Sequence, residues 1–431
     1  MRKSAGAAAT VPLASAFLAA CKNPRNEVAI QQGGLARPDN PITLDVNQEM
    51  LIPDGQTAEA GPLKLYNWEQ YINPRTLKAA EAALGVPIEL TTFNTMSEAI
   101  SKLTNAKLDY DVFMGVTKDV VGRLVATDLL RPLNHSYLPN TENVWSSFTD
   151  PGKPFWDVGE QYTVPYTVYT TGIGYRVDNG PNEHITLDLA PLEQQIPSMS
   201  NPYDILFDTT YKPYVHILDD YRDAIGMTML RATYPNGTPD LNTSDTKVLD
   251  KARTDLLDLA SVMNVKADVS DYRDLPEGES YIHQGWSGDF ISVQYYYPGW
   301  SPRDVIRYWY PENHKGEIGG DLLTILQGGK NPVLAHQFLN FMLDFDNAMV
   351  NFKWNGYMPP MKRITSADQL LRNSKDPLQN PDGTESYNVV PPSLGTAITS
   401  QADFDDGYQA LELAPAVDEK YKSVWEAFQT A

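Results

Sequence analysis

Short apolar stretches recur along the chain, and most of them precede a segment whose apolar residues have helical spacing. In the first part of the chain, this pattern predicts strands at 63–66, 88–93 and 111–114, and helices at 73–85, 97–103 and 120–125. Asn73 followed by Pro74 is typical of a helix start, because the Asn side chain can accept a hydrogen bond from a free backbone N–H. Gly85 is typical of a helix end. Alternating strands and helices predict a parallel sheet with crossover helices, which is an α/β fold.

The same alternation resumes after about residue 170. A strand at 216–218 precedes a helix at 224–230. A strand at 322–326 precedes another helix, whose start we expect Asn331 and Pro332 to cap. Two further amphipathic helices are predicted at 246–262 and 416–428, since their apolar residues fall on one face. Residues 372–395 are rich in Pro, Asn and Ser, and we expect an irregular segment there.

The N-terminus has the composition of an export signal. Arg2 and Lys3 precede an apolar stretch of small residues that ends in Leu-Ala-Ala-Cys at the only cysteine, Cys21. These four residues resemble the lipobox of bacterial lipoproteins, which implies that residues 1–20 are removed and that Cys21 is lipidated. We therefore expect an exported protein anchored to the outer face of the cytoplasmic membrane. Residues 22–62 are polar and rich in Pro and Gly, so we expect a flexible tether there.

Composition excludes several classes of function. The formal net charge is −21, and phosphate binding needs clustered cations, so nucleic acid is an unsuitable partner. No run after the signal reaches the length of a membrane-spanning helix. The six histidines are scattered and the chain contains no P-loop motif, so we expect no zinc site and no cofactor.

One segment invites comparison with a catalytic motif. Residues 285–289 read GWSGD around Ser287, similar to the nucleophile elbow of hydrolases, but Asp289 stands where that turn needs a second glycine. His283 precedes Ser287 by four residues, unlike the order found in those enzymes. A secreted hydrolase that uses Ser287 is therefore a distant alternative, and we expect a protein without catalytic residues.

Aromatic residues follow several predicted strands. The chain has 24 Tyr and 8 Trp, and Trp68, Tyr71, Trp286 and Tyr357 lie close to strand ends or turns. Ligands of open α/β sheets bind beyond the carboxyl ends of strands. Aromatic rings with a few carboxylates there would suit an ammonium group, by cation–π attraction and charged hydrogen bonds. Packing in a hydrophobic core is the alternative role for each ring.

Several of these segments resemble the spermidine/putrescine-binding proteins of bacterial ABC importers. The resemblance extends from about residue 63 to 430 and is carried, in the family's order, by 65–72 (LYNWEQYI), 110–113 (YDVF), 164–166 (VPY), 170–175 (TTGIGY), 218–223 (LDDYRD), 285–288 (GWSG), 320–321 (GD) and 355–359 (NGYMP). It implies the two-lobed fold of the type II periplasmic binding proteins, with a hinge of at least two strands and a ligand cleft between the lobes. We expect lobe 1 at 63–168 and 320–365, and lobe 2 at 169–319 and 366–431.

The resemblance also implies partners and site residues. The protein would be a monomer that captures a small amine and delivers it to a permease and ATPase complex. The implied ligand-binding residues are Trp68, Tyr71, Asp220, Asp223, Trp286, Asp321 and Tyr357. Asp220 and Asp223 are three residues apart at a helix start, so both carboxylates could face one amine. Acidic residues there also balance the helix dipole without any ligand.

Four positions depart from the polyamine-binding pattern. Val116 and Lys118 replace polar or aromatic ligand contacts, Gly319 replaces a tryptophan, and Gln70 replaces an acidic residue. Lys118 would repel an ammonium if it points into the cleft, and Gly319 removes one wall of the aromatic box. The ligand is therefore a polyamine or, alternatively, another cationic or zwitterionic metabolite.

Overall fold

The computed structural model describes residues 35–105, 109–150, 153–180, 187–300, 303–380 and 382–431. Their strands form one mixed sheet in the order β2-β1-β3-β10-β5-β8-β6-β7, with β4 paired to β10 and β9 paired to β5. The strands are β1 (Leu63–Trp68), β2 (Ile88–Phe93), β3 (Val112–Thr117), β4 (Leu130–Arg131), β5 (Thr163–Arg176), β6 (Val215–Leu218), β7 (Lys266–Asp268), β8 (Ile282–Trp286), β9 (Ile306–Trp309) and β10 (Glu317–Leu326).

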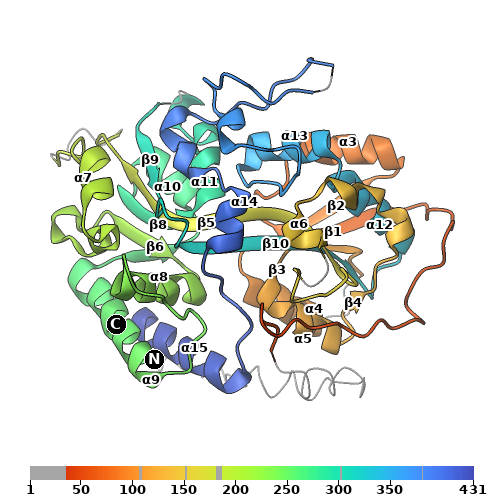
Figure 1. The fold of residues 1–431 in the computed structure, drawn as a ribbon, viewed down its shortest axis with the longest axis horizontal. Helices are drawn as coiled ribbons and strands as arrows, with labels where there is room; N and C mark the ends of the chain where they lie inside the picture. The colour runs from red at the N-terminus through yellow and green to blue at the C-terminus, as the bar shows by residue number, and fades with distance from the viewer. Residues whose placement is uncertain (1–34, 106–108, 151–152, 181–186, 301–302, 381) are drawn as a thin grey trace, which may run out of the picture.

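Helices cover both faces of this sheet (Figure 1). The α-helices are α3 (Pro74–Leu84), α4 (Met96–Asn105), α5 (Val121–Ala126), α6 (Ser146–Thr149), α7 (Leu192–Ser198), α8 (Tyr221–Thr233), α9 (Thr246–Asp258), α10 (Asp271–Glu277), α11 (Ser287–Ser292), α12 (Pro332–Met342), α13 (Phe345–Asn355), α14 (Gln401–Asp406) and α15 (Pro415–Gln429). No helix of the described residues has the length and apolar character needed to cross a bilayer.

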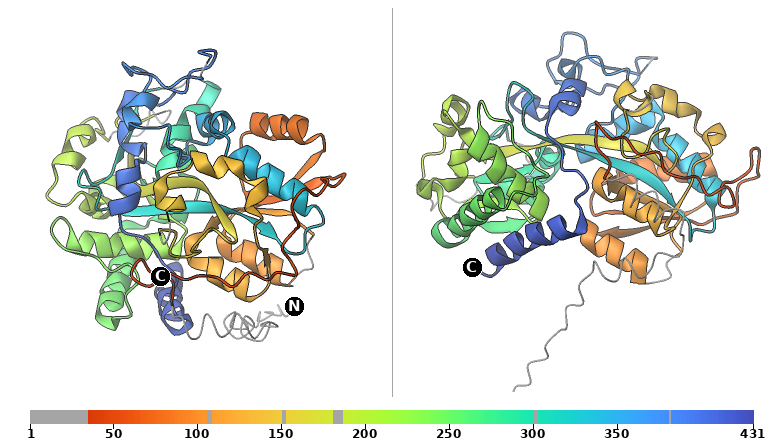
Figure 2. Two further views of the ribbon diagram at one scale, coloured as in Figure 1. Left: turned by 45° about the vertical axis from the view of Figure 1, so that its right-hand side comes forward. Right: turned by 60° about the horizontal axis from the view of Figure 1, so that its bottom comes forward.

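Two long strands connect the two ends of the sheet. β5 and β10 run antiparallel through the middle of the molecule, while β1–β3 and β6–β8 form parallel groups on either side (Figures 1 and 2). The buried apolar residues fall into a larger cluster around β1–β4 and a smaller one around β6–β8. The predicted α/β class is confirmed, and the arrangement is two-lobed.

Most predicted elements are confirmed within a few residues. The side chain of Asn73 accepts from the Arg75 amide at the start of α3, and Gly85 ends that helix at φ 71°. Asn331 precedes α12, but its side chain does not cap the helix; its amide nitrogen donates to the Pro62 carbonyl and to Asp111. β10 begins five residues before the predicted 322, since its first half (EIGGD) lacks the apolar alternation of a strand.

The tether predicted for residues 22–62 is wrong for residues 35–62, which pack against the folded body. Leu44 is buried in the larger cluster, and the backbone of Ile42 bonds with Phe155 and Val158. The carboxylate of Glu59 accepts from the backbone amides of Val333 and Leu334 at the N-terminus of α12. Cys21 and the predicted signal lie outside the described residues.

The C-terminal part of the chain contacts both clusters. Residues 370–411 contribute apolar side chains to the larger cluster, whereas α15 packs against α8 and α9 of the smaller one. Tyr421, Val424 and Trp425 of α15 are buried, as its periodicity predicted. The lobe boundaries expected from the sequence stay a prediction.

Candidate functional site

A cavity of about 1130 Å³ lies between the two lobes, where β1, β3, β6 and β8 end. Its lining includes every residue of the predicted ligand-binding set, namely Trp68, Tyr71, Asp220, Asp223, Trp286, Asp321 and Tyr357. Residues of both lobes therefore face one space. That these side chains contact a ligand stays a prediction.

Asp321 forms one acidic end of this cavity. It lies on β10 where the register shifts against β5, and such an irregularity re-aims neighbouring side chains. The Tyr71 hydroxyl donates to its Oδ2 at 2.7 Å and the Tyr169 hydroxyl to its Oδ1 at 3.3 Å. Burial raises the pKa of Asp321 to about 6, although both tyrosines and Lys118 oppose the shift. Asp321 therefore offers a charged acceptor that two hydroxyl groups hold in place.

Asp220 and Asp223 form the second acidic end, at the start of α8. Asp220 caps the helix by accepting from the backbone amides of Arg222 and Asp223, so the alternative role considered from sequence is present. Asp223 accepts from the Thr171 hydroxyl at 2.8 Å and from the Trp286 indole N–H at 3.3 Å. Burial, followed by the charge of Asp220, raises the pKa of Asp223 to about 7. Two electrostatically interacting carboxyl groups therefore face the cavity at this end.

Glu317 extends this second end and was not predicted. It is only 4% exposed, lines the cavity from β10, and its Oε2 has no hydrogen-bond partner among the described residues. Burial raises the pKa of Glu317 well above its usual value, and the charges of Asp223 and Asp220 add to the shift. Asp220, Asp223 and Glu317 are called the α8 carboxylates below.

Aromatic rings connect the two acidic ends. Ring centroids are 6.5 Å apart between Trp68 and Trp286, 6.2 Å between Trp286 and Tyr169, 5.5 Å between Tyr169 and Tyr357, and 4.8 Å between Tyr357 and Tyr71. These five residues form a continuous aromatic wall, of which only Tyr169 was absent from the predicted set.

Gly319 lies opposite Tyr169 and leaves room for its ring. The two residues pair across β10 and β5, and a Cβ added at Gly319 would lie 2.2 Å from the Tyr169 ring. The Tyr169 ring thus fills the space over Gly319. The expectation that Gly319 leaves the aromatic box without a wall is therefore wrong. Gly288 makes room for the Tyr357 ring in the same way, with 2.3 Å between that ring and an added Cβ.

Lys118 lines the cavity, but its ammonium group is already engaged. Its Nζ donates to Gln409 Oε1 at 2.7 Å and lies over the rings of Phe404 and Trp156. Burial lowers the pKa of Lys118 to about 7, despite the opposing charge of Asp321. Val116 is fully buried in the larger cluster and does not line the cavity.

A pair of carboxyl groups lies behind Tyr357. The Tyr357 hydroxyl donates to Asp289 Oδ2 at 2.9 Å, and burial raises the pKa of Asp289 to about 7. The neighbouring Asp271 is fully buried, and burial together with Asp289 raises its pKa well above the usual range. At neutral pH this pair can share a proton, which anchors the Tyr357 ring.

Ser287 has none of the partners of a hydrolytic nucleophile. It is 2% exposed, accepts from the Thr170 amide and contacts the Thr399 hydroxyl. His283 instead contacts the Gln284 carbonyl and Asp268. In the described part of the chain, no histidine is hydrogen-bonded to Ser287.

Comparisons with known proteins agree with this arrangement. Residues 76–376 match the family of bacterial extracellular solute-binding proteins. A putrescine/cadaverine-binding protein of Pseudomonas aeruginosa is 26% identical over 297 residues, which cover 68% of this chain and 77% of that protein. The putrescine-binding periplasmic protein PotF of Escherichia coli is 23% identical over 297 residues, covering 66% and 74%. The structure of the TpPotD lipoprotein of Treponema pallidum shares the fold, with a TM-score of 0.65, 19% identity and coverage of 86% and 99%.

The family match includes elements of both lobes and more than half of the chain. Two lobes, long connecting strands and an inter-lobe cavity are the features that this fold supplies. The chain therefore belongs to the bacterial extracellular solute-binding proteins.

Proposed function

We propose that this protein is the substrate-binding subunit of an ABC importer and that it captures a polyamine of the putrescine or spermidine kind. The observation that carries the proposal is the pair of acidic ends, Asp321 and the α8 carboxylates, separated by an aromatic wall in one cavity. A linear molecule with a cationic group at each end matches this arrangement. The relatives named above that bind putrescine support the same ligand class.

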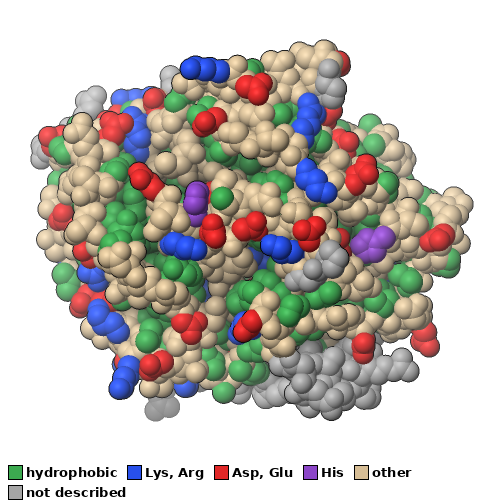
Figure 3. Space-filling model, in the orientation of Figure 1, with side chains coloured by type: hydrophobic (Ala, Val, Ile, Leu, Met, Phe, Trp, Pro, Cys, Tyr) green, Lys and Arg blue, Asp and Glu red, His purple; other side chains and the backbone are tan. Residues whose placement is uncertain are grey.

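Physical chemistry favours such a ligand. Charge-assisted hydrogen bonds to ammonium groups are about twice as strong as neutral ones. The methylene chain between the two ends would pack on the rings of the aromatic wall, which also attract cations. The net charge of −21 attracts cationic ligands from solution. On the face drawn in Figure 3, basic side chains lie singly among acidic ones rather than in one patch.

The alternative ligand is a zwitterion. Lys118 lines the same cavity as Asp321, so a ligand with one ammonium and one carboxylate could pair with both. This alternative retains the transport role and changes only the ligand.

The transport role implies further properties. We expect the protein to be exported, anchored through a lipid on Cys21, monomeric, and without catalytic activity of its own. Ligand binding would close the two lobes about β5 and β10, and the closed form would dock on the permease and ATPase complex.

A binding panel tests the ligand class. Purified protein is screened by thermal shift against putrescine, cadaverine, spermidine, agmatine and common amino acids, and hits are measured by calorimetry and by solution scattering. A diamine or polyamine should raise the melting temperature, bind at one site and reduce the radius of gyration. Binding of amino acids alone would replace the polyamine with a zwitterion, and a Cys21→Ala variant that stays in the membrane fraction would contradict the anchor.

A further inference from the structure

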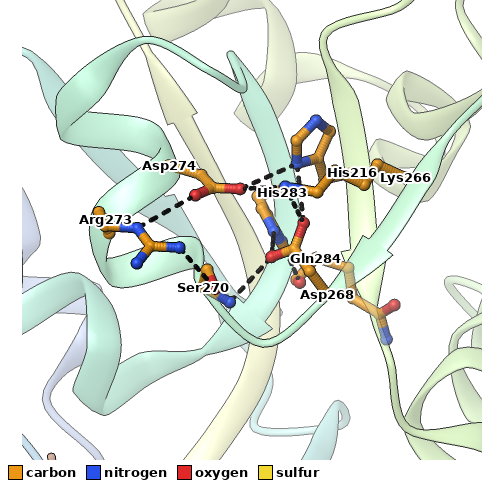
Figure 4. Close-up of polar contacts among 8 residues, drawn as sticks. All are labelled: His216, Lys266, Asp268, Ser270, Arg273, Asp274, His283 and Gln284. Carbon is orange, nitrogen blue, oxygen red and sulfur yellow. Dashed lines mark hydrogen bonds and ion pairs between the residues drawn. The ribbon is translucent and has the colours of Figure 1, made fainter.

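We propose that His216, Asp268 and His283 form a binding site for one divalent transition-metal ion of the Zn²⁺ type, beside the ligand cavity in the smaller lobe. The site goes beyond the transport function, and nothing in the polyamine proposal requires it. Figure 4 shows the three side chains converging from neighbouring strands.

The sheet register brings these residues together. β6 lies between β7 and β8, and all three strands are parallel. His216 is the direct cross-strand neighbour of His283 on one side and of Lys266 on the other. Asp268 is two residues beyond Lys266, so it lies on the same face of the sheet. The two imidazole rings are 5.3 Å apart between centroids.

The two histidine–carboxylate distances match those around a tetrahedral ion. One ligand atom from each of the three side chains lies within 4.8 Å of the other two. His216 Nδ1 is 3.2 Å from Asp268 Oδ2, and His283 Nε2 is 3.3 Å from Asp268 Oδ1. A Zn²⁺ ion with bonds of about 2.0–2.2 Å holds its ligand atoms about 3.3 Å apart.

The hydrogen bonds of His283 point to the metal-binding tautomer. Its Nδ1 is 2.7 Å from the backbone carbonyl of Gln284, and a carbonyl only accepts, so Nδ1 carries the hydrogen. In the neutral ring, Nε2 then directs a lone pair at the carboxylate of Asp268. Two lone pairs repel unless a proton or a metal ion lies between them. A backbone carbonyl on the other ring nitrogen is the usual support of a metal-ligating histidine.

His216 provides an independent observation. It is 5% exposed, and its Nδ1 lies 3.2 Å from Asp268 Oδ2 and 3.5 Å from Asp274 Oδ2 without hydrogen-bond geometry to either. That Asp268 oxygen also lacks a hydrogen bond, although the Lys266 ammonium group is 3.2 Å away. A buried nitrogen and a buried carboxylate oxygen are therefore close together without satisfying each other, which is the arrangement that an ion between them would complete.

Lys266 competes with an ion for Asp268, and both Lys266 and Arg273 pair with the neighbouring Asp274. Lys266 Nζ is 3.2 Å from Asp268 Oδ2 and 2.9 Å from Asp274 Oδ2, and Arg273 Nε is 3.7 Å from Asp274 Oδ1. The Lys266 side chain is 55% exposed, so it can leave Asp268 and keep Asp274 when an ion binds. The alternative is a closed network of ion pairs in which both histidines are protonated.

Metal titration of the full-length protein, after a chelator has removed any bound metal, distinguishes a metal site from a network of ion pairs. We expect one equivalent of Zn²⁺ to bind by calorimetry, to stay with the protein through gel filtration, and to raise the melting temperature. His216→Gln and His283→Gln should each weaken binding at least about tenfold to a hundredfold. His314→Gln is the matched control, because it removes a histidine–carboxylate pair with Asp403 elsewhere in the chain, and binding should not change.

Lys266→Met separates metal binding from a folding defect. Removing the competing ammonium should strengthen Zn²⁺ binding about threefold or more, since a like charge close to the site is withdrawn. Co²⁺ bound to the wild-type protein should give the intense visible absorption of a tetrahedral site, and both histidine variants should lose it. The proposal is overturned if the wild-type protein retains no metal, or if binding is the same in both histidine variants.

Discussion

The carboxyl groups at the two acidic ends of the cavity differ in their hydrogen-bond partners and in the charges beside them. Asp321 is satisfied by the hydroxyl groups of Tyr71 and Tyr169, with Lys118 as a nearby opposite charge. The α8 carboxylates are crowded instead, and Glu317 Oε2 has no hydrogen-bond partner. The pKa of Asp321 is raised to about 6 and that of Asp223 to about 7, in line with this difference.

The comparison indicates what each end contributes to binding. Asp321 is pre-organised, so a ligand ammonium placed there gains a strong charged hydrogen bond at little cost in reorganisation. The α8 carboxylates repel one another in the unliganded protein, and an ammonium there relieves that repulsion. Fixed geometry at one end and unbalanced charge at the other would together select a dication.

Acidification should have the largest effect because it acts on both ends. The raised pKa values mean that protonation occurs as the pH falls through about 7 and then about 6. Amine affinity should then fall by about a hundredfold between pH 8 and pH 5, because both carboxyl groups lose their charge. Calorimetry across this range measures the change. A constant affinity would show that neither Asp321 nor Asp223 binds the amine.

The free energy of unfolding of the unliganded protein should rise on acidification, whereas amine affinity falls. A carboxyl group whose folded pKa is raised contributes stability that is fully present below its unfolded pKa and is lost as the pH rises through its folded pKa. For these two groups, that loss falls between about pH 4 and pH 8. Thermal unfolding with and without ligand separates the two trends.

Asp321→Asn should have the next largest effect. The amide keeps the shape but removes the carboxylate that the Tyr71 and Tyr169 hydroxyl groups hold at this end of the cavity. A charged hydrogen bond contributes on the order of 1.5–3 kcal/mol, so amine affinity should fall roughly ten- to a hundredfold at pH 8. Calorimetry gives the affinity, and the exposed Asp376→Asn serves as the control for loss of one charge. Wild-type affinity in the Asp321 variant would refute the polyamine proposal at this end.

The sequence predicted the parts of the fold that local patterns encode. Asn73, Pro74 and Gly85 mark both ends of α3, and the structure has that helix at Pro74–Leu84. Residues 35–62 were misassigned because their attachment depends on a few buried contacts, such as Leu44 and the Glu59 carboxylate, within a polar segment. The start of β10 was missed because its pairing with β5 stabilises it, not its own apolar pattern.

The site residues also divide into those that local motifs predict and those that depend on strand pairing. Residues within the recognisable motifs, such as Trp68 and Asp321, do line the cavity. Tyr169 was missed because its place depends on its register opposite Gly319, which no single segment shows. A glycine on one strand opposite a tyrosine on another was the only signal available. His216 and His283 were treated as isolated for the same reason, although they are adjacent across β6 and β8.

Asp223→Asn should weaken binding less than Asp321→Asn, because Asp220 still supplies a carboxylate at that end and Glu317 can lose its proton beside a bound ammonium. We expect a loss of about three- to tenfold, below the value of a full charged hydrogen bond. The unliganded variant should unfold at a higher temperature than wild type at pH 8, since one source of repulsion is gone. Calorimetry and thermal unfolding test both effects. A lower melting temperature would contradict the view that these carboxylates repel one another.

Lys118→Met should have the smallest effect at pH 8 and thereby identifies the ligand. Methionine retains an unbranched apolar side chain and removes the ammonium group that lies over Phe404. Burial lowers the pKa of Lys118 to about 7, so the wild-type side chain is mostly neutral at pH 8 and repels an amine little. At pH 6 it is charged, and its removal should improve amine affinity, partly offset because the pKa of Asp321 then rises further. Amine calorimetry at both pH values should show a change within about threefold at pH 8.

A ligand with a carboxylate near Lys118 would show the reverse, a large loss of affinity in the Lys118 variant that is greatest at pH 6. The zwitterion would then replace the polyamine as the proposed ligand.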